Sequence, residues 1–322
     1  MEMKYDIEAD WILLKTCNFR CDYCGWKAED LGSKLTTYGT HEQWVEGFQA
    51  TGKTWLLHLT GGEPSLYPDF VGLCEQLAKH HYLSINSNLS RASIVDFAER
   101  INPERVHYIN AAVHSDERQK HTSQEIFIRH VQTLQKRQFN VLVSTVMNPA
   151  MVRQFPNLSE YFESHGLILL PKAMRGKYMG KEYPDSYTAD ERKLILEYLA
   201  AATKKYSPVI KKMGEAPTID MFADSRFLER IPDYRGKLCG SGFNLVTLGP
   251  NGTIFRCGSG KVLGNLLVKK VKLLRRPAVC DTSYCPYFCE KYTSPKFAAM
   301  EVVPDTSFSQ SLSSMARRFF VN

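Results

Sequence analysis

The feature that most constrains this chain is a group of three cysteines near its N-terminus, Cys17, Cys21 and Cys24, spaced CxxxCxxC. They follow a short apolar run, residues 11–15, that is typical of a strand. A loop this tight can turn three thiolates toward one point, but it supplies no fourth ligand. Structural zinc sites and fully ligated ferredoxin clusters take four protein ligands, whereas reactive centres keep an open position. The spacing therefore favours a metal centre with a free coordination site, and part of a zinc knuckle is the alternative.

Length and composition indicate a soluble protein with one large domain and a smaller one. The chain has 322 residues, of which 43% are hydrophobic, and its apolar runs, such as residues 167–170, are far shorter than the ~20 residues that span a bilayer. Residues 1–6 lack the features of a signal peptide, so we expect a cytoplasmic location and no membrane. The nine cysteines then indicate metal ligands or reactive thiols rather than disulfides.

The positive charge of the chain does not predict a nucleic-acid partner. The formal net charge is +7, but the basic residues are scattered except in segment 269–276, which is typical of a solvated surface. No RNA-binding motif accompanies them.

A second motif, Gly61-Gly62-Glu63-Pro64, ends the apolar run 54–60, which has the length of a strand. Glycines allow a backbone to come close to a ligand, and Pro64 stops strand pairing. Backbone carbonyls and the Glu63 carboxylate are expected to face a bound cation.

The two motifs, separated by one predicted helix and one predicted strand, resemble the signature of the radical S-adenosylmethionine (SAM) enzymes. The resemblance implies that Cys17, Cys21 and Cys24 hold three irons of a 4Fe-4S cluster whose fourth iron chelates SAM. It also implies that Tyr23 borders the adenine and that the Gly-Gly-Glu-Pro turn holds the amino group of SAM.

Strand and helix patterns alternate after the first motif, which argues for parallel βαβ units. Six strands are expected from Ile12 onward, and this number matches the partial (β/α)6 barrel that the resemblance implies. The predicted strands are residues 11–15, 54–60, 82–86, 106–113, 141–146 and 167–170. The predicted helices are residues 43–48, 70–78, 94–100, 126–138 and 158–164.

Ligands of such barrels gather at the C-terminal ends of the strands. That rule nominates the residues Asn86, Ser87, Asn88, His114, Ser115, 144–148, Lys172 and Arg175. By resemblance, Asn88 and Ser144 contact the ribose or carboxylate of SAM. Lys172 and Arg175, beside Gly176, are candidates to bind an anionic group of SAM or substrate. The alternative for each is a capping or turn residue. His114 is a candidate for substrate contact.

Two further residues are expected to belong to the core. These are His107, in a predicted strand, and Cys74, on a predicted helix.

The domain boundaries follow from a shift in composition. We expect a radical SAM barrel at 1–175, a helical bridge at 176–236 and an auxiliary cluster domain at 237–322. In the bridge, Thr188 and Glu191 form a capping-box pattern before an apolar helix, and the bridge is long enough to lie across the open side of the barrel.

The C-terminal cysteines predict a second metal site. Residues 243–256 have the pattern of a β-hairpin with an Asn-Gly turn, which would place Cys239 beside Cys257. The arrangement is similar to the SPASM and twitch domains that carry auxiliary 4Fe-4S clusters, with too few cysteines for a full SPASM domain. The predicted ligands are Cys239, Cys257, Cys285 and Cys289.

Cys280 is the thiol left over from this set, and we expect it to donate a hydrogen atom to a substrate radical. The alternative makes Cys280 the ligand and leaves Cys285 spare, and zinc is the alternative metal.

The resemblance implies reductive cleavage of SAM to a 5′-deoxyadenosyl radical that abstracts hydrogen from a substrate C–H bond. An auxiliary cluster points to oxidation or epimerisation, with a flavodoxin- or ferredoxin-type reductant. The cysteine loop begins at residue 17, which leaves no room before it for a leader-peptide-binding domain. We therefore expect a small-molecule natural-product intermediate, such as a sugar, aminoglycoside or nucleoside, as the substrate. The alternatives are a ribosomally synthesised peptide and, in another class, a non-catalytic iron–sulfur or zinc protein.

Overall fold

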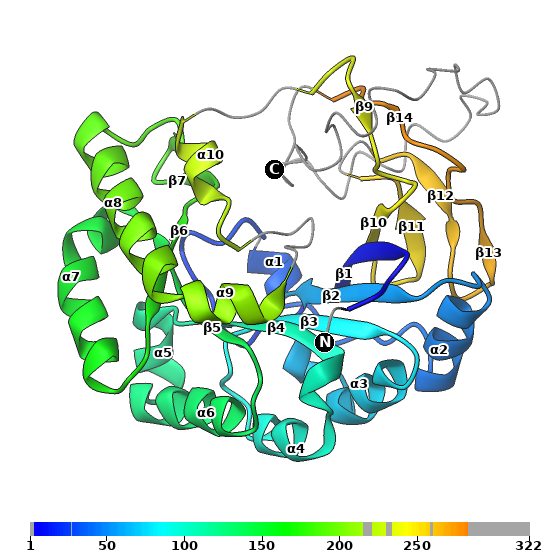
Figure 1. The fold of residues 1–322 in the computed structure, drawn as a ribbon, viewed down its shortest axis with the longest axis horizontal. Helices are drawn as coiled ribbons and strands as arrows, with labels where there is room; N and C mark the ends of the chain where they lie inside the picture. The colour runs from blue at the N-terminus through cyan, green and yellow to red at the C-terminus, as the bar shows by residue number, and fades with distance from the viewer. Residues whose placement is uncertain (1–2, 27, 215–220, 230–233, 258–259, 283–322) are drawn as a thin grey trace.

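The centre of the molecule is a curved sheet whose first strands run parallel and neighbour one another in chain order (Figure 1). The computed structural model describes residues 3–26, 28–214, 221–229, 234–257 and 260–282. The parallel strands are β1 (Ile7–Leu14), β2 (Trp55–Gly61), β3 (Tyr82–Ser87), β4 (Val106–Ala112), β5 (Val141–Met147) and β6 (Leu169–Ala173). The predicted α/β partial barrel is confirmed, although β1 begins earlier than the sequence pattern indicated.

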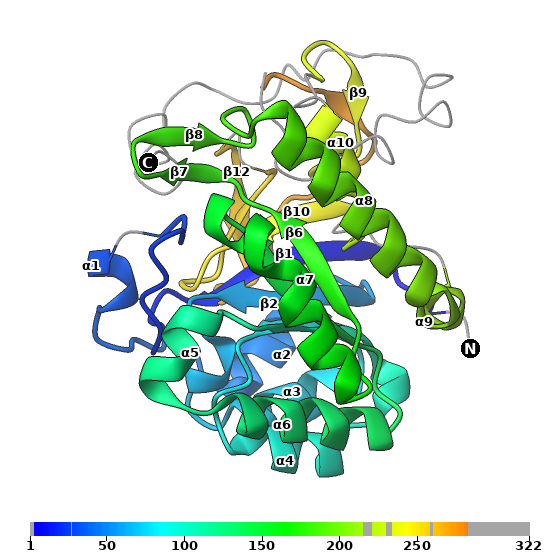
Figure 2. The same ribbon diagram turned by 90° about the vertical axis from the view of Figure 1, so that its left-hand side faces the viewer.

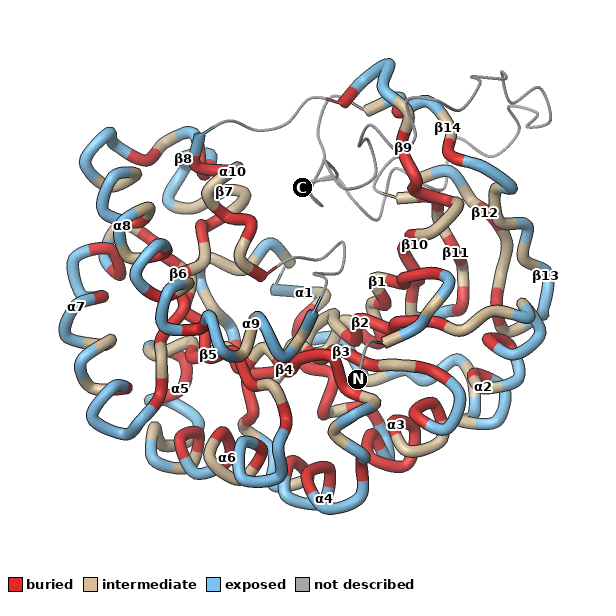
Figure 3. The backbone as a smooth tube through the Cα atoms, in the orientation of Figure 1, coloured by how far each residue is buried: buried red, intermediate tan, exposed pale blue. Residues whose placement is uncertain are grey.

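Helices cover the convex side of this sheet (Figure 1). They are α2 (His41–Gln49), α3 (Phe70–Ala78), α4 (Ser93–Arg100), α6 (Gln124–Lys136) and α7 (Pro149–Ser164). Figure 3 shows the division that follows: the strands are mostly buried, and the outward sides of the helices are exposed. The local sequence fixes where α2 begins, because Thr40 and Gln43 form a capping box that satisfies backbone N–H donors at its first turn.

Aromatic side chains fix β1 against its neighbours. The rings of Trp11 and Trp44 lie 4.7 Å apart, and Phe48 packs on both Trp11 and Trp55. These four side chains are fully buried, and each such burial stabilises a fold by roughly 1.5–3 kcal/mol. The strand that leads into the cysteine loop therefore has a rigid base.

The C-terminal hairpin continues the same sheet. Strand β10 (Leu245–Leu248) pairs in parallel with β1 and antiparallel with β11 (Thr253–Phe255). Strands β12 (Val262–Asn265) and β13 (Lys270–Val271) extend the sheet further. The hairpin was predicted correctly, but its pairing with β1 was not predicted.

The segment after β6 covers part of the concave face. Helix α8 (Ala189–Lys205) starts at Thr188 with the predicted capping box, and its Leu199 and Ala202 pack in one cluster with Tyr108, Leu142 and Leu170 of β4–β6. Figure 2 shows α8 beside α7 and β6. The segment also contains β7 (Gly176–Tyr178), β8 (Lys181–Tyr183), α9 (Ser207–Met213) and α10 (Asp224–Glu229).

Short elements complete the described structure. They are α1 (Ala28–Leu31), the 3-10 turns η1 (Pro64–Leu66) and η2 (Pro103–Arg105), α5 (Ser115–His121), β9 (Leu238–Cys239) and β14 (Ala278–Val279). Within the described ranges, no helix is both long and apolar enough to span a bilayer.

Candidate active site

A cavity of about 430 Å³ lies where the parallel strands end. Most of the predicted barrel residues meet here, since its lining includes Cys17, Cys21, Tyr23, Cys24, Gly61, Gly62, Glu63, Asn86, Ser87, Asn88, His114, Ser144, Lys172 and Arg175. Pro64 is not in this lining; it is the first residue of η1, whose N-cap is Glu63. A cavity of this size suits a ligand as large as SAM.

The three thiols of the loop share this cavity and resist ionisation. Burial raises the pKa of Cys17 to about 11 and that of Cys21 to about 12, and it also raises the pKa of Cys24. Metal ligation requires the thiolate, so loading the loop must release protons. Three neutral thiols around one space form a donor set that fits an iron–sulfur cluster with one iron left open.

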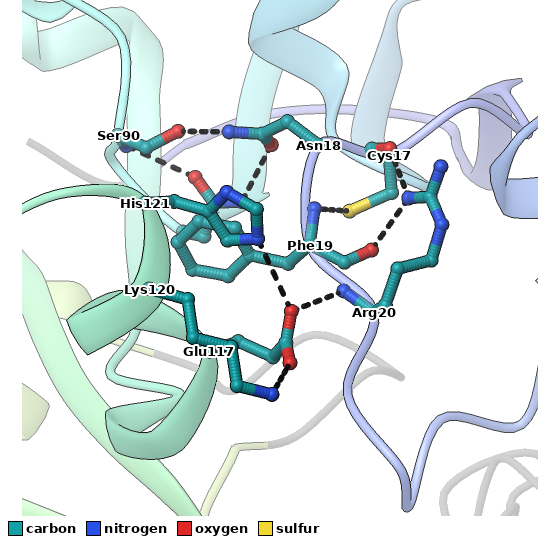
Figure 4. Close-up of polar contacts among 9 residues, drawn as sticks. Cys17, Asn18, Phe19, Arg20, Ser90, Glu117, Lys120 and His121 are labelled. Carbon is teal, nitrogen blue, oxygen red and sulfur yellow. Dashed lines mark hydrogen bonds and ion pairs between the residues drawn. The ribbon is translucent and has the colours of Figure 1, made fainter.

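Helix α5 holds one side of the cysteine loop (Figure 4). The backbone N–H of Arg20 donates to Glu117 at 2.8 Å, and the same carboxylate pairs with Lys120 and with His121. The ring of His121 also stacks on Phe19, with centroids 5.5 Å apart. The sequence reasoning missed this support, because α5 contains no apolar residue and so shows no periodic pattern.

The end of β3 holds the other side of the loop. Asn18 donates to the hydroxyl of Ser90 at 2.8 Å and accepts from the Asn88 amide at 3.0 Å. The Asn88 side chain also accepts from the backbone of Ser90, at 2.9 Å. Asn88, predicted to contact SAM, thus lines the cavity while its amide fastens the loop to β3.

The two glycines of the second motif serve contacts within the chain. A Cβ on Gly61 would lie 2.1 Å from the Leu14 carbonyl oxygen, and a Cβ on Gly62 would lie 2.1 Å from that of Thr16. Gly61 also has a φ of 127°, which only glycine adopts readily. The turn binds the loop directly, because Gly62 N–H donates to Leu14 and Glu63 N–H donates to Thr16, each at 2.9 Å. We expected the glycines to admit a ligand; they also admit the start of the cysteine loop.

Glu63 has a structural role that the sequence did not indicate. Its carboxylate accepts from the N–H and hydroxyl of Ser65, from the Ser87 hydroxyl and from the Asn88 N–H, at 2.6–3.0 Å. Three of these four bonds end on Oε1, and Oε2 accepts only from the Asn88 N–H, so Oε2 keeps an acceptor site. The side chain was expected to face a cation; it also ties the ends of β2 and β3 together, and the contact with a cation stays a prediction.

Tyr23 and His114 form an uncharged pair in the cavity wall. The Tyr23 hydroxyl lies 2.8 Å from Nδ1 of His114. Burial lowers the pKa of His114 to about 4 and raises that of Tyr23, so both are neutral at pH 7. His114 has a φ of 47°, and such left-handed backbone in a non-glycine residue is frequent at functional sites. His107 is buried, as predicted, and is not part of this wall.

Polar side chains from four neighbouring strands line the same space. Thr60, Asn86, Asn110 and Ser144 come from β2, β3, β4 and β5 respectively. The Ser144 hydroxyl donates to the side-chain oxygen Oδ1 of Asn110 at 2.7 Å, and the buried Oδ1 of Asn86 has no hydrogen-bond partner in the described structure. Thr60 and Asn110 were missed, although each lies near the C-terminal end of its strand, where ligands of such barrels gather.

Lys172 and Arg175 form a cationic edge at the end of β6. Both reach the buried carboxylate of Asp224 on α10, at 2.7 and 3.1 Å. Burial acts to raise the pKa of Asp224, but the two cations outweigh it and hold that pKa below its usual value. Lys172 and Arg175 thus place two cations and one carboxylate at this edge of the cavity.

The second group of cysteines lies away from the cavity lining. Cys239 and Cys280 are buried in one small cluster with Tyr234 and Leu245. Arg256, next to Cys257, donates to the carbonyl oxygens of Ser241, Ala278 and Val279, and so joins the segments that carry all three cysteines. Cys285 and Cys289 lie outside the described residues. Cys74 is buried on α3, as predicted.

The neighbourhood of Cys280 favours the alternative role for it. Cys280 does not line the cavity, and β14 brings it beside Cys239. In the described part of the chain, no three His, Cys, Asp or Glu side chains are grouped to hold one metal ion. The auxiliary cluster, its ligands and the hydrogen-donor role of Cys280 stay predictions.

Comparison with known proteins agrees with this geometry. The radical SAM superfamily model matches residues 11–154. A GTP 3′,8-cyclase of Pseudomonas fluorescens (strain Pf0-1) is 37% identical over 81 residues, which are 23% of this chain and only 24% of the cyclase.

Solved structures show the same fold at low identity. The structure of anSMEcpe with bound AdoMet has a TM-score of 0.55 and 15% identity, covering 82% of this chain and 76% of that one. Streptococcus suis SuiB bound to precursor peptide SuiA has a TM-score of 0.51 and 14% identity, covering 80% of this chain and 60% of SuiB. Residues 11–154 thus match the radical SAM superfamily, a family that implies a 4Fe-4S cluster and AdoMet, another name for SAM.

Proposed function

We propose that this radical SAM enzyme oxidises or epimerises a small polar molecule, such as the sugar or cyclitol part of a natural-product intermediate. The observation that carries the proposal is that the cysteine loop and the polar side chains of β2–β5 line one cavity. When bound, the cluster and SAM supply a 5′-deoxyadenosyl radical that removes hydrogen from a C–H bond. The chain contributes binding, orientation and exclusion of water.

Each group of residues in the cavity would have a separate binding role. Cys17, Cys21 and Cys24 would ligate the cluster, and the carbonyls of the Gly61–Glu63 turn would accept from the amino group of SAM. Tyr23 would border the adenine, and Ser144 with Asn110 would present a hydroxyl and an amide to the ribose or substrate. Neutral donors and acceptors of this kind suit hydroxyl-rich ligands, because each can pair without a buried charge.

A peptide substrate is the second candidate. It is supported by solved structures of similar fold that hold peptides, SuiB with SuiA and anSMEcpe with a Cp18Cys peptide. Their identity to this chain is 14% in both cases, so only the fold is shared.

The test begins with anaerobic reconstitution of the whole chain with iron and sulfide. We expect a brown protein that releases 5′-deoxyadenosine from SAM under reduction by dithionite or a flavodoxin-type reductant. A colourless zinc protein that leaves SAM intact would end the proposal. Substrate class is then decided by adding aminocyclitols, sugars and nucleosides, or precursor-type peptides, and measuring which class accelerates SAM cleavage and is itself converted.

A further inference from the structure

Arg118, on α5, is a cation buried completely behind the cysteine loop. Its side chain has no exposed surface. Its Nε donates to the Val113 carbonyl at 2.8 Å, and one terminal nitrogen donates to the carbonyls of Ala112 and Asn88. The other terminal nitrogen, Nη1, is buried and has no hydrogen-bond partner in the described structure. Burying such a donor is costly, so the position calls for an explanation.

Two aromatic rings contact the guanidinium of Arg118, and one of them belongs to the cysteine loop. The guanidinium lies 5.5 Å from the ring centroid of Phe19, the residue midway between Cys17 and Cys21. The guanidinium also lies 4.2 Å from the ring centroid of Phe127. Cation–π contacts of this kind hold a guanidinium in place without cancelling its charge.

The nearby carboxylates do not pair with Arg118 directly. Glu117 is engaged by Arg20, Lys120 and His121. Glu63 is engaged by Ser65, Ser87 and Asn88. It makes no ion pair with Arg118, but its charge acts on the guanidinium and favours the protonated form, and Asn88 bridges the two groups, since its N–H donates to Glu63 and its carbonyl accepts from Arg118. Burial lowers the pKa of Arg118 only to about 10, so the side chain is still protonated at pH 7.

We infer that Arg118 is a positioning residue that supplies a fixed counter-charge to the cluster held by this loop and thereby raises its reduction potential. The inference rests on the radical SAM function of the loop. Three thiolates make the site anionic, and reduction adds a further negative charge. A cation held in a region of low dielectric stabilises the reduced form more than the oxidised form, and water does not screen it.

The test is a redox titration of the reconstituted protein, followed by EPR. The cluster of the loop is identified as the one whose signal changes when SAM is added. The variants are Arg118→Gln, which removes the charge, and Arg118→Lys, which keeps it without the planar fork. The control is Arg100→Gln, because Arg100 is an exposed arginine that pairs with Glu75. The iron content of the wild-type protein is measured first. If the wild type takes up no cluster, the radical SAM function fails, and this outcome is distinct from a failure of the inference about Arg118.

We expect Arg118→Gln to lower the potential by at least the equivalent of a tenfold loss of reduced cluster, about 59 mV for one electron. Arg118→Lys and Arg100→Gln should stay at the wild-type potential. An unchanged potential in an Arg118→Gln protein with full iron content would overturn the inference. If that variant holds no cluster, Arg118→Lys decides: a wild-type potential supports the charge role, and a lowered potential refutes it.

Discussion

The two groups of cysteines in this chain are built in different ways. Cys17, Cys21 and Cys24 lie on one loop and face a cavity, whereas Cys239, Cys257 and Cys280 come from three separate segments and do not line it. Each group has a buried arginine that donates to three backbone carbonyls, Arg118 in the first and Arg256 in the second. The two groups differ in their access to the cavity. A reactive centre needs an open coordination position, whereas a site that does not line the cavity suits a structural or electron-transfer centre.

The largest expected effect separates the two groups directly. Replacing Cys17, Cys21 and Cys24 with Ala should abolish SAM cleavage, because no other described thiols line the cavity. We expect about four irons to remain of about eight, since each 4Fe-4S cluster holds four. Iron analysis and 5′-deoxyadenosine release measure this. Complete loss of iron in a folded triple variant would mean that the second cluster, as assigned, does not exist.

Cys280 gives the next largest effect. Because it is buried beside Cys239, we expect Cys280→Ala to lose about half of the iron and to keep SAM cleavage. The matched control is Cys74→Ala, another buried thiol that lies on α3. If Cys280→Ala keeps all its iron but no longer incorporates solvent deuterium into an epimerised product, Cys280 is the hydrogen donor instead.

A third substitution, at Gly62, tests the close contact between the Gly-Gly-Glu-Pro turn and the start of the cysteine loop. Gly62→Ala would place a Cβ 2.1 Å from the Thr16 oxygen and 2.4 Å from the Lys15 oxygen, both backbone atoms that lead into the loop. We expect the free energy of unfolding of the metal-free protein to fall by about 3 kcal/mol, with reduced iron uptake. Gly25→Ala is the control, since its Cβ would meet nothing within 4 Å. Equal unfolding curves for the two variants would contradict this role of Gly62.

These contacts also show which parts of the site sequence patterns could predict. The cysteine loop, the Gly-Gly-Glu-Pro turn and the strand ends are local patterns, and the structure brings them to one cavity. The supports of the loop are different, because Glu117, Arg118 and His121 lie in a helix without apolar residues. The pairing of β10 with β1 joins segments more than 200 residues apart in sequence, and no local period records such a pairing.

A fourth prediction uses pH on the metal-free loop. The pKa of Cys17 is about 11, against an ordinary value of 9.0, because burial favours the neutral thiol. At pH 8 its thiolate fraction is therefore about 100-fold lower, and alkylation by iodoacetamide should be slower by the same factor. The rate should rise about tenfold per pH unit up to pH 10. Mass spectrometry of Cys17 peptides measures it, and a rate equal to that of a free cysteine at pH 8 would show that the loop is open without metal.

The smallest expected effect tests the second arginine. Arg256→Met removes donors to Ser241, Ala278 and Val279 and leaves the carbonyl of the buried Ser241 short of a partner. We expect a loss of about 2 kcal/mol in the free energy of unfolding, and faster hydrogen exchange in β9 and β14. SAM cleavage should be unchanged, because Arg256 does not line the cavity. The control is Arg100→Met on the exposed surface. If Arg256→Met instead lowers the reduction potential of the SAM-responsive cluster as Arg118→Gln does, the two groups of cysteines are electrostatically coupled. The contrast between an open and a closed centre then fails.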